Sequence, residues 1–157
     1  MPVFISYERH DEPSATAAYA ALRAAKITAY LDVLDPNLKK GENATAAILS
    51  GVEKCTHVLT IVSQTTKSSW WVPFEVGAAT RSAKRITTYR RDATVLPDYL
   101  TIWPVVNNLH ELDRFIVRYF QDRAHSETNY TFAEARYKTL NSATDFHAAL
   151  KRDLGQQ

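Results

Sequence analysis

The sequence predicts an α/β fold: an open, doubly wound parallel sheet of about five strands with helices on both faces. Short apolar segments rich in β-branched residues alternate with helix-favouring segments along the chain. Residues 57–63, HVLTIVS, are nearly continuous in apolar and β-branched residues, which is typical of a central parallel strand covered on both faces. Right-handed crossovers between such strands place the connecting helices on both faces of the sheet.

The first unit is a strand, a loop and a helix. Residues 2–6, PVFIS, are short, apolar and partly β-branched, and a polar stretch follows them. Residues 14–26, SATAAYAALRAAK, are rich in alanine and favour a helix. Residues 27–31, ITAYL, form the next β-type segment, and Pro36 and Gly41 punctuate the loop after it. This unit therefore predicts the first two strands and the first helix.

The middle of the chain predicts a second and a third helix around the central strand. Asn43 or Thr45 can cap a helix that runs to about Lys54, with Ile48, Leu49 and Val52 on one face. After the central strand at 57–63, the polar loop QTTKSS leads into a helix over about 70–84. The central strand is expected at the middle of the sheet.

The last part predicts two more strands and two long helices. The expected strands are residues 86–89 and a short fifth strand within 96–106. Residues 109–122 place Leu109, Leu112, Phe115, Ile116 and Tyr119 at helical spacing, and 130–153 form one more helix, interrupted near Asn141. Residues 1–122 are expected to form one domain, and residues 123–157 a helical extension packed on it.

Composition narrows the classes of function. The chain has 157 residues, of which 45% are hydrophobic and 23% charged, as in ordinary globular proteins. No apolar run reaches bilayer length and the N-terminus turns charged early, so neither a membrane span nor a signal peptide is expected, and the location is expected to be cytoplasmic. A net charge of +2 with scattered basic residues does not indicate nucleic-acid binding.

Cysteine and histidine usage argues against a metal or disulfide framework. Cys55 is the only cysteine and precedes an apolar run, so we expect a buried thiol. The five histidines are scattered without ligand spacing, and no metal site is expected. No GxGxxG or GxxxxGK[ST] pattern occurs, so a nucleotide would bind without a glycine-rich cradle.

Residues 68–77, SSWWVPFEVG, form the most informative segment. Pro73 lacks an N–H and fits only near a helix start, with Ser68 or Ser69 as cap. Trp71 and Glu75 are four residues apart and should share one face, near the carboxyl ends of the strands where open α/β sheets bind ligands. This site is expected to be partly exposed. The pattern also fits a plain alternative, in which Glu75 is a first-turn acid that complements the helix dipole and the tryptophans are core or rim residues.

Four separated segments resemble the Toll/interleukin-1 receptor (TIR) domain family, particularly its bacterial members. VFISYERHDE is similar to the first-strand box, AYLDVLDPNLKKGEN to the second strand and its BB loop, WVPFE to the WxxxE segment, and LPDYLTIWPVV to a late strand region. The resemblance covers about residues 2–121 and implies the parallel-sheet fold predicted above. It further suggests small stand-alone TIR proteins of anti-phage systems such as Thoeris.

In this family, enzymatic members cleave the bond between nicotinamide and ribose in NAD+, and the resemblance implies that Glu75 is the catalytic glutamate. Nicotinamide leaves NAD+ as a neutral molecule and needs no general acid, so a single carboxylate suffices, unlike in ordinary glycoside hydrolysis. NAD+ would be the substrate, and no cofactor is implied. The product would be ADP-ribose, a cyclic isomer or a conjugate that a separate effector protein senses.

Six further residues are expected to bind substrate by the same resemblance: Ser6, Tyr7, Arg9, Asp32, Lys40 and Trp71. Alternatives remain for several of them. Trp71 can be core packing, Arg9 a surface arginine, and Lys40 a solvated loop charge, while Asp32 can order the BB loop.

Two alternative functions stay open. The chain can be a non-catalytic TIR scaffold that self-associates through the BB loop, or an enzyme similar to nucleoside deoxyribosyltransferases, whose fold and glutamate chemistry are related. A phosphoacceptor receiver domain is disfavoured because the third strand ends in Ser63 and not in aspartate.

Overall fold

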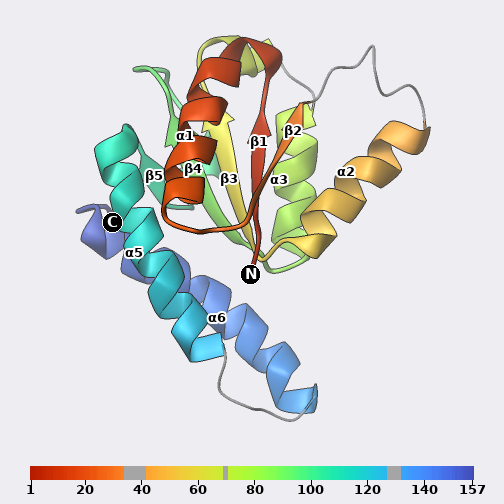
Figure 1. Ribbon diagram of the computed structural model, residues 1–157, viewed down its shortest axis with the longest axis vertical. Helices are drawn as coiled ribbons and strands as arrows, with labels where there is room; N and C mark the ends of the chain where they lie inside the picture. Colours follow the sequence, from red (N-terminus) through yellow and green to blue (C-terminus); the bar gives the residue numbers. More distant parts are fainter. Residues whose placement is uncertain (34–41, 69–70, 127–131) are drawn as a thin grey trace.

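A computed structural model shows a five-stranded, all-parallel sheet between two layers of helices (Figure 1). The structure describes residues 1–33, 42–68, 71–126 and 132–157; within these ranges, the side chains of residues 32–33, 42–45, 47–48, 67–68, 71, 126 and 132–141 are not described. The strands are β1 Val3–Tyr7, β2 Ala29–Val33, β3 His57–Val62, β4 Arg85–Arg90 and β5 Val105–Val106. Their order is β2-β1-β3-β4-β5, which confirms the predicted fold class and places β3 at the centre.

The helices alternate with the strands as predicted. The α-helices are α1 Glu12–Ala24, α2 Glu42–Lys54, α3 Trp71–Arg81, α4 Asp98–Thr101, α5 Leu109–Ser126 and α6 Phe132–Asp153, and the 3-10 helices are η1 Arg9–Asp11 and η2 Thr65–Ser68. The expected interruption near Asn141 is wrong, since α6 is continuous there. None of the helices, over the residues described, combines the length and apolar character needed to cross a bilayer.

Two helix ends differ from the sequence prediction for the same physical reason. After α1, Lys26 has a φ of +60° and the Ile27 N–H donates to the carbonyl of Leu22, which is the long closing bond of a helix C-terminal cap. The chain therefore turns at 25–28, and β2 begins two residues later than predicted. After α3, Ala83 has a φ of +50° and the Lys84 N–H donates to the carbonyl of Ala79, so this helix ends before Lys84.

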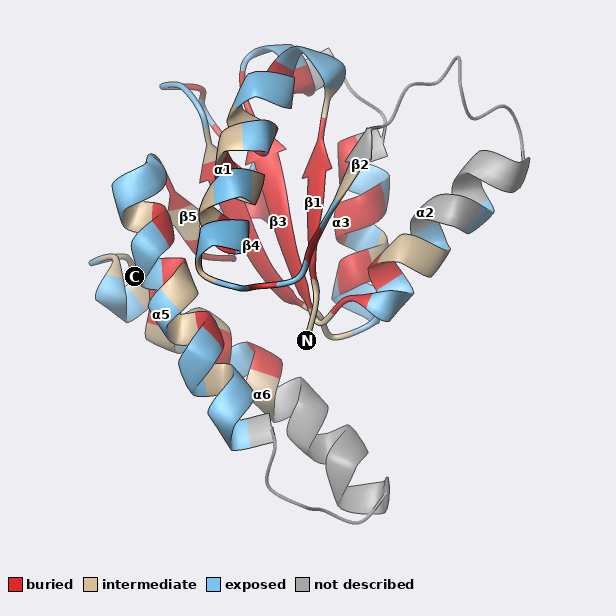
Figure 2. Cartoon of the chain, in the orientation of Figure 1, coloured by how far each residue is buried: buried red, intermediate tan, exposed pale blue. Residues whose placement is uncertain are grey.

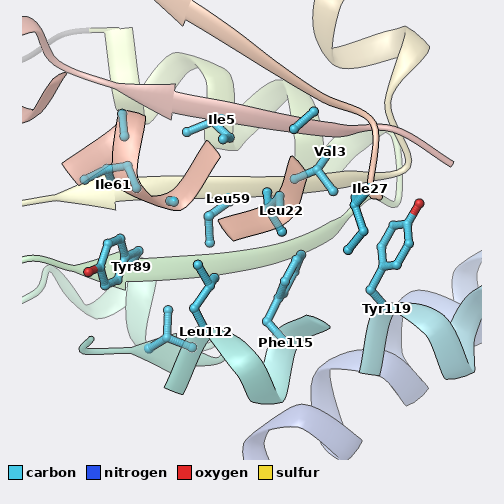
Figure 3. Packing of buried hydrophobic residues seen from close by; sticks show 14 of the residues in the cluster. Val3, Ile5, Leu22, Ile27, Leu59, Ile61, Tyr89, Leu112, Phe115 and Tyr119 are labelled. Carbon is cyan, nitrogen blue, oxygen red and sulfur yellow. The ribbon is translucent and has the colours of Figure 1, made fainter. Parts of the chain in front are cut away.

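The sheet separates two apolar cores. One core lies on the α1 and α5 face and is drawn in Figure 3; it includes Val3, Ile5, Leu22, Leu59, Ile61, Leu112, Phe115 and Tyr119. The other lies on the α2 and α3 face and includes Phe4, Val52, Val58, Val72, Val76 and Ile86. Leu49 and Leu109 were predicted on the inward faces of their helices, but both are exposed, because the buried faces centre on Val52 and on Leu112.

Cys55 belongs to the second core and has the predicted buried thiol. Burial raises the pKa of this thiol to about 11, because the effect of burial is larger than the opposite effect of the nearby Lys84 ammonium. The thiolate form is therefore rare at neutral pH, and Cys55 is a packing residue.

The C-terminal segment is part of the same globule. Phe146 and Leu150 of α6 are buried in the core of the α1 and α5 face, and Figure 2 shows β1, β3 and β4 as mostly buried. The domain boundary expected between residues 122 and 123 falls inside α5. The helical extension thus packs on the sheet through its own apolar face.

Candidate functional site

Glu75 lies inside the protein, against the sheet. It is the fifth residue of α3, whose first turn contains no acidic residue. Its side chain is 0% exposed, so the expectation of a partly exposed carboxylate is wrong. An acid that merely complements the helix dipole would sit in the first turn and in water. Because burying a carboxylate is costly, this position calls for a specific partner or a chemical role.

One described partner is Ser6. Its hydroxyl donates a hydrogen bond to Oε2 of Glu75, and both side chains are fully buried. Ser6 is the fourth residue of β1, one before the carboxyl end of that strand. The contact therefore joins two of the residues that sequence analysis singled out, although they are 69 positions apart in the chain.

Ser6 begins a row of hydroxyl residues across the sheet. The register pairs Ser6 with Thr60 of β3, and Thr60 with Thr88 of β4. Residues paired in adjacent parallel strands point to the same face. The hydroxyls of Thr60 and Thr88 are buried and have no hydrogen-bond partner among the described residues. Among the described residues of this row, only Ser6 has a described hydrogen bond to an ionisable side chain.

The other expected site residues are not gathered around Glu75 by any described contact. Tyr7 is buried in the core on the opposite face of the sheet, because side chains alternate along a strand. Arg9 is exposed in η1. Asp32 is paired with Ser6 in register, and Trp71 begins α3, but neither side chain is described. Lys40 lies outside the described residues, as do the rest of the expected BB loop and the cap at Ser69.

A second buried carboxylate at the same edge of the sheet was missed. Asp11 is fully buried, and its Oδ2 accepts hydrogen bonds of 2.8 Å from the hydroxyls of Ser63 and Thr66. Its Oδ1 pairs with Nη1 of Arg91 at 2.9 Å. Asp11 follows β1, and its partners follow β3 and β4, so Asp11 connects the loops at the carboxyl ends of three strands. The available signal was Ser63 and Thr66, two hydroxyl residues spaced by three directly after the central strand.

A third polar cluster lies at the amino ends of the strands, away from Glu75. Arg85, the first residue of β4, pairs through Nε with Oδ2 of Asp122 at 2.8 Å, and both side chains are 7% exposed. The Ser142 hydroxyl donates to Oδ1 of Asp122 at 3.0 Å. A pocket of about 490 Å³ opens beside them between α5 and α6, with Phe146 and Gln121 in its wall.

Two histidines in that region are held neutral. Burial, reinforced by the Arg85 guanidinium, lowers the pKa of His57 well below its usual value. Burial and the same guanidinium lower the pKa of His147 to about 4. Neutral imidazoles suit the contacts they make, because Nε2 of His147 accepts a hydrogen bond of 2.8 Å from the backbone N–H of Ile86. No group of three metal-ligating side chains occurs in the described part of the chain.

The family assignment comes from a comparison with protein families. The TIR domain family matches residues 3–127. The chain belongs to the TIR domain family. The match extends from β1 through the end of α5, so Ser6, Asp11 and Glu75 all lie within the TIR domain, whereas α6 lies beyond the matched segment.

Two solved structures are similar to this TIR domain, and the first of them supports its fold. A 2-deoxyribosyltransferase from the psychrotolerant bacterium Bacillus psychrosaccharolyticus superposes with a TM-score of 0.59 at 12% sequence identity, covering 86% of this chain and 96% of that one. The TIR domains of the activated Roq1 resistosome, which directly recognizes the pathogen effector XopQ, align with a TM-score of 0.49 at 16% identity, over 98% and 97% of the two chains. A search of curated proteins gives no match.

Proposed function

We propose that this TIR domain is an enzyme that cleaves the nicotinamide–ribose bond of NAD+, with Glu75 as its catalytic carboxylate. One observation carries the proposal: in a TIR chain, the glutamate of the WVPFE segment is fully buried against the sheet near the carboxyl end of β1, held by the Ser6 hydroxyl. A buried acid at the ligand-binding edge of a parallel sheet is difficult to explain by folding alone.

The chemistry needs only this one acid. When the C–N bond breaks, its electron pair goes to the ring nitrogen and turns the pyridinium into neutral nicotinamide, so no proton is required. The anomeric carbon and ring oxygen of the ribose then share a positive charge, which a carboxylate stabilises. Water can add to that carbon and release a proton to give ADP-ribose. Attack by a group of the same nucleotide gives a cyclic isomer, and attack by a second molecule gives a conjugate.

Burial of Glu75 implies a rearrangement before catalysis. A carboxylate with 0% exposure cannot touch a nucleotide, so NAD+ reaches it only after neighbouring chain has moved or a second copy has reshaped the site. We therefore expect the isolated chain to be a resting form with low turnover. Self-association through the BB loop is the form of activation that the family resemblance suggests.

We propose further that the product serves as a signal in bacterial anti-phage immunity, read by a separate effector protein in the cytoplasm. This step rests on the resemblance of the sequence to small Thoeris-type TIR proteins. The identity of the product tests this signalling role. A signal must be a cyclic or conjugated ADP-ribose, because a receptor has to distinguish it from the products of ordinary NAD+ turnover.

The direct test is product analysis by chromatography and mass spectrometry. Concentrated protein is incubated with NAD+, with and without extract from phage-infected cells, and nicotinamide, ADP-ribose, cyclic isomers and conjugates are measured. Glu75→Gln should abolish nicotinamide release, whereas Glu53→Gln, which changes an exposed glutamate at the end of α2, should not. Undiminished release by Glu75→Gln would refute the assigned role.

Two other outcomes separate the alternatives. A parallel incubation with deoxynucleosides tests the chemistry of the superposed 2-deoxyribosyltransferase, and release of free base there without nicotinamide release from NAD+ would favour that class. The scaffold alternative predicts a different outcome. The chain would be inert toward both substrates at high concentration but would self-associate, and the Glu75→Gln variant would signal normally.

A further inference from the structure

We infer that Ser6 is a positioning residue for Glu75: its hydroxyl orients the carboxylate and favours the ionised form that the reaction needs. The inference deepens the proposed function and rests on it for its catalytic part. Sequence analysis assigned Ser6 to direct substrate contact. In the structure its hydroxyl is engaged by Glu75, so its influence on a nucleotide would pass through that carboxylate.

The two partners differ in how firmly they are held. Ser6 lies in β1, which is hydrogen-bonded to β2 on one side and β3 on the other, and its backbone is in register with Asp32 and Thr60. A serine on such a strand has a fixed Cβ and one rotatable bond before its oxygen. Glu75 has three rotatable bonds and reaches the sheet from a helix. A short donor on the rigid strand therefore orients the longer, freer acid.

Burial of Glu75 increases the effect of the Ser6 hydrogen bond on its charge. A buried carboxylate loses the water that would stabilise its charge, and burial alone favours the protonated form. A hydroxyl that donates to the carboxylate counteracts that tendency, because it stabilises the charged state more than the neutral one. The protein thus keeps an acid in an apolar layer of α3 and the sheet, with Val72 and Val76 buried on the same helix.

The next strand provides a matched control. Thr60 is paired with Ser6, is 0% exposed and carries a hydroxyl with no partner among the described residues. Thr60→Val removes a hydroxyl of the same depth and row while keeping the shape of the side chain. Any effect that comes merely from altering a polar group under α3 should appear in this variant as well.

The primary test is titration of the Glu75 carboxyl carbon by NMR on glutamate-labelled protein, with the signal assigned by its absence in Glu75→Gln. Ser6→Ala should move the titration midpoint to higher pH by about 1 pH unit, as expected for loss of one hydrogen bond to a charged group. Thr60→Val should leave the midpoint unchanged. Ser6→Thr, which keeps a hydroxyl, should have a midpoint close to that of the wild type. An unchanged midpoint in folded Ser6→Ala overturns the positioning role.

Kinetics supply the second readout and separate the two proposals. If Ser6 positions the acid, Ser6→Ala lowers kcat about 10- to 100-fold, leaves KM nearly unchanged and moves the acidic limb of the pH profile upward with the NMR midpoint. A rise in KM with unchanged kcat would show direct substrate contact and overturn the inference. A shifted NMR midpoint in a protein that releases no nicotinamide, even when it is concentrated and incubated with extract from phage-infected cells, would refute the proposed function and leave the Ser6–Glu75 relationship intact.

Discussion

The side-chain amide of Gln156 makes both hydrogen bonds to the backbone of Val105 that another strand would make. The Val105 N–H donates to Oε1 at 2.9 Å, and Nε2 donates to the Val105 carbonyl at 2.5 Å. Further along the same edge, His147 accepts the N–H of Ile86. Because β5 has only two residues, it leaves part of β4 uncovered, and α6 with its C-terminal residues satisfies these edge groups.

Gln156→Ala should therefore loosen this edge. Two backbone groups of Val105 lose their partners, and we expect the free energy of unfolding to fall by about 1 to 2 kcal/mol. Hydrogen exchange of the Val105 amide should accelerate. Gln157→Ala is the control, since that exposed side chain has no described bond; an equal effect of the two variants would contradict the role of Gln156.

The neutral state of His147 predicts acid-sensitive stability. Its pKa is lowered to about 4 in the folded chain from 6.5 when unfolded, so between these values the unfolded chain binds a proton that the folded chain does not. The free energy of unfolding should fall as the pH drops through this window, by about 1.4 kcal/mol per pH unit for this one proton. Buried His57 shifts in the same direction and adds to the loss.

Two substitutions isolate the His147 contribution in urea unfolding between pH 7.5 and 5. His147→Gln keeps an acceptor for Ile86 but cannot titrate, so its stability should depend less steeply on pH. His147→Leu leaves the Ile86 N–H without its partner and should lose about 1 to 3 kcal/mol even at pH 7.5. Equal pH slopes in the wild type and in His147→Gln would show that this imidazole does not control the transition.

The fold could be predicted because its sequence signals are local. The site could be predicted only in part, because its contacts join residues that are far apart in the sequence. Apolar periodicity identified the strands, and Pro73 fixed the start of α3 near Glu75. Nothing in the sequence near Glu75 indicates its burial, and its described partner Ser6 lies 69 positions away in the chain. Similarly, the sequence did not single out Asp11, because its partners lie beyond residue 60.

Two glycines should respond oppositely to alanine. A Cβ on Gly51 of α2 would lie 2.9 Å from the ring of Phe4, which is buried in the core. Gly51→Ala should therefore destabilise the chain by about 1 to 3 kcal/mol. Gly77 in α3 has open space at this position, and Gly77→Ala should stabilise by up to about 1 kcal/mol through helix propensity. Thermal unfolding of both variants checks the pair, and stabilisation by Gly51→Ala would contradict the packing of α2 on β1.

Asp11 and Arg91 should contribute unequally although they form one ion pair. Asp11→Ala leaves the buried hydroxyls of Ser63 and Thr66 without their acceptor, and we expect a loss of about 3 kcal/mol in urea unfolding. The Arg91 side chain is 43% exposed, so Arg91→Ala should cost about 1 kcal/mol or less. Equal losses would mean that the ion pair, and not the hydroxyl contacts, holds the three loops together.

Glu75→Gln should separate stability from activity. The amide oxygen can still accept from Ser6, while the variant no longer buries a charge, so we expect an unchanged or higher melting temperature by calorimetry. Nicotinamide release should nevertheless be lost, because a neutral amide cannot stabilise the positive charge that develops on the ribose. Both results together would support the proposal that the buried acid is kept for its chemistry. If Glu75→Gln unfolds well below the wild type, the carboxylate is instead a structural element of the α3 interface, and its burial no longer supports catalysis.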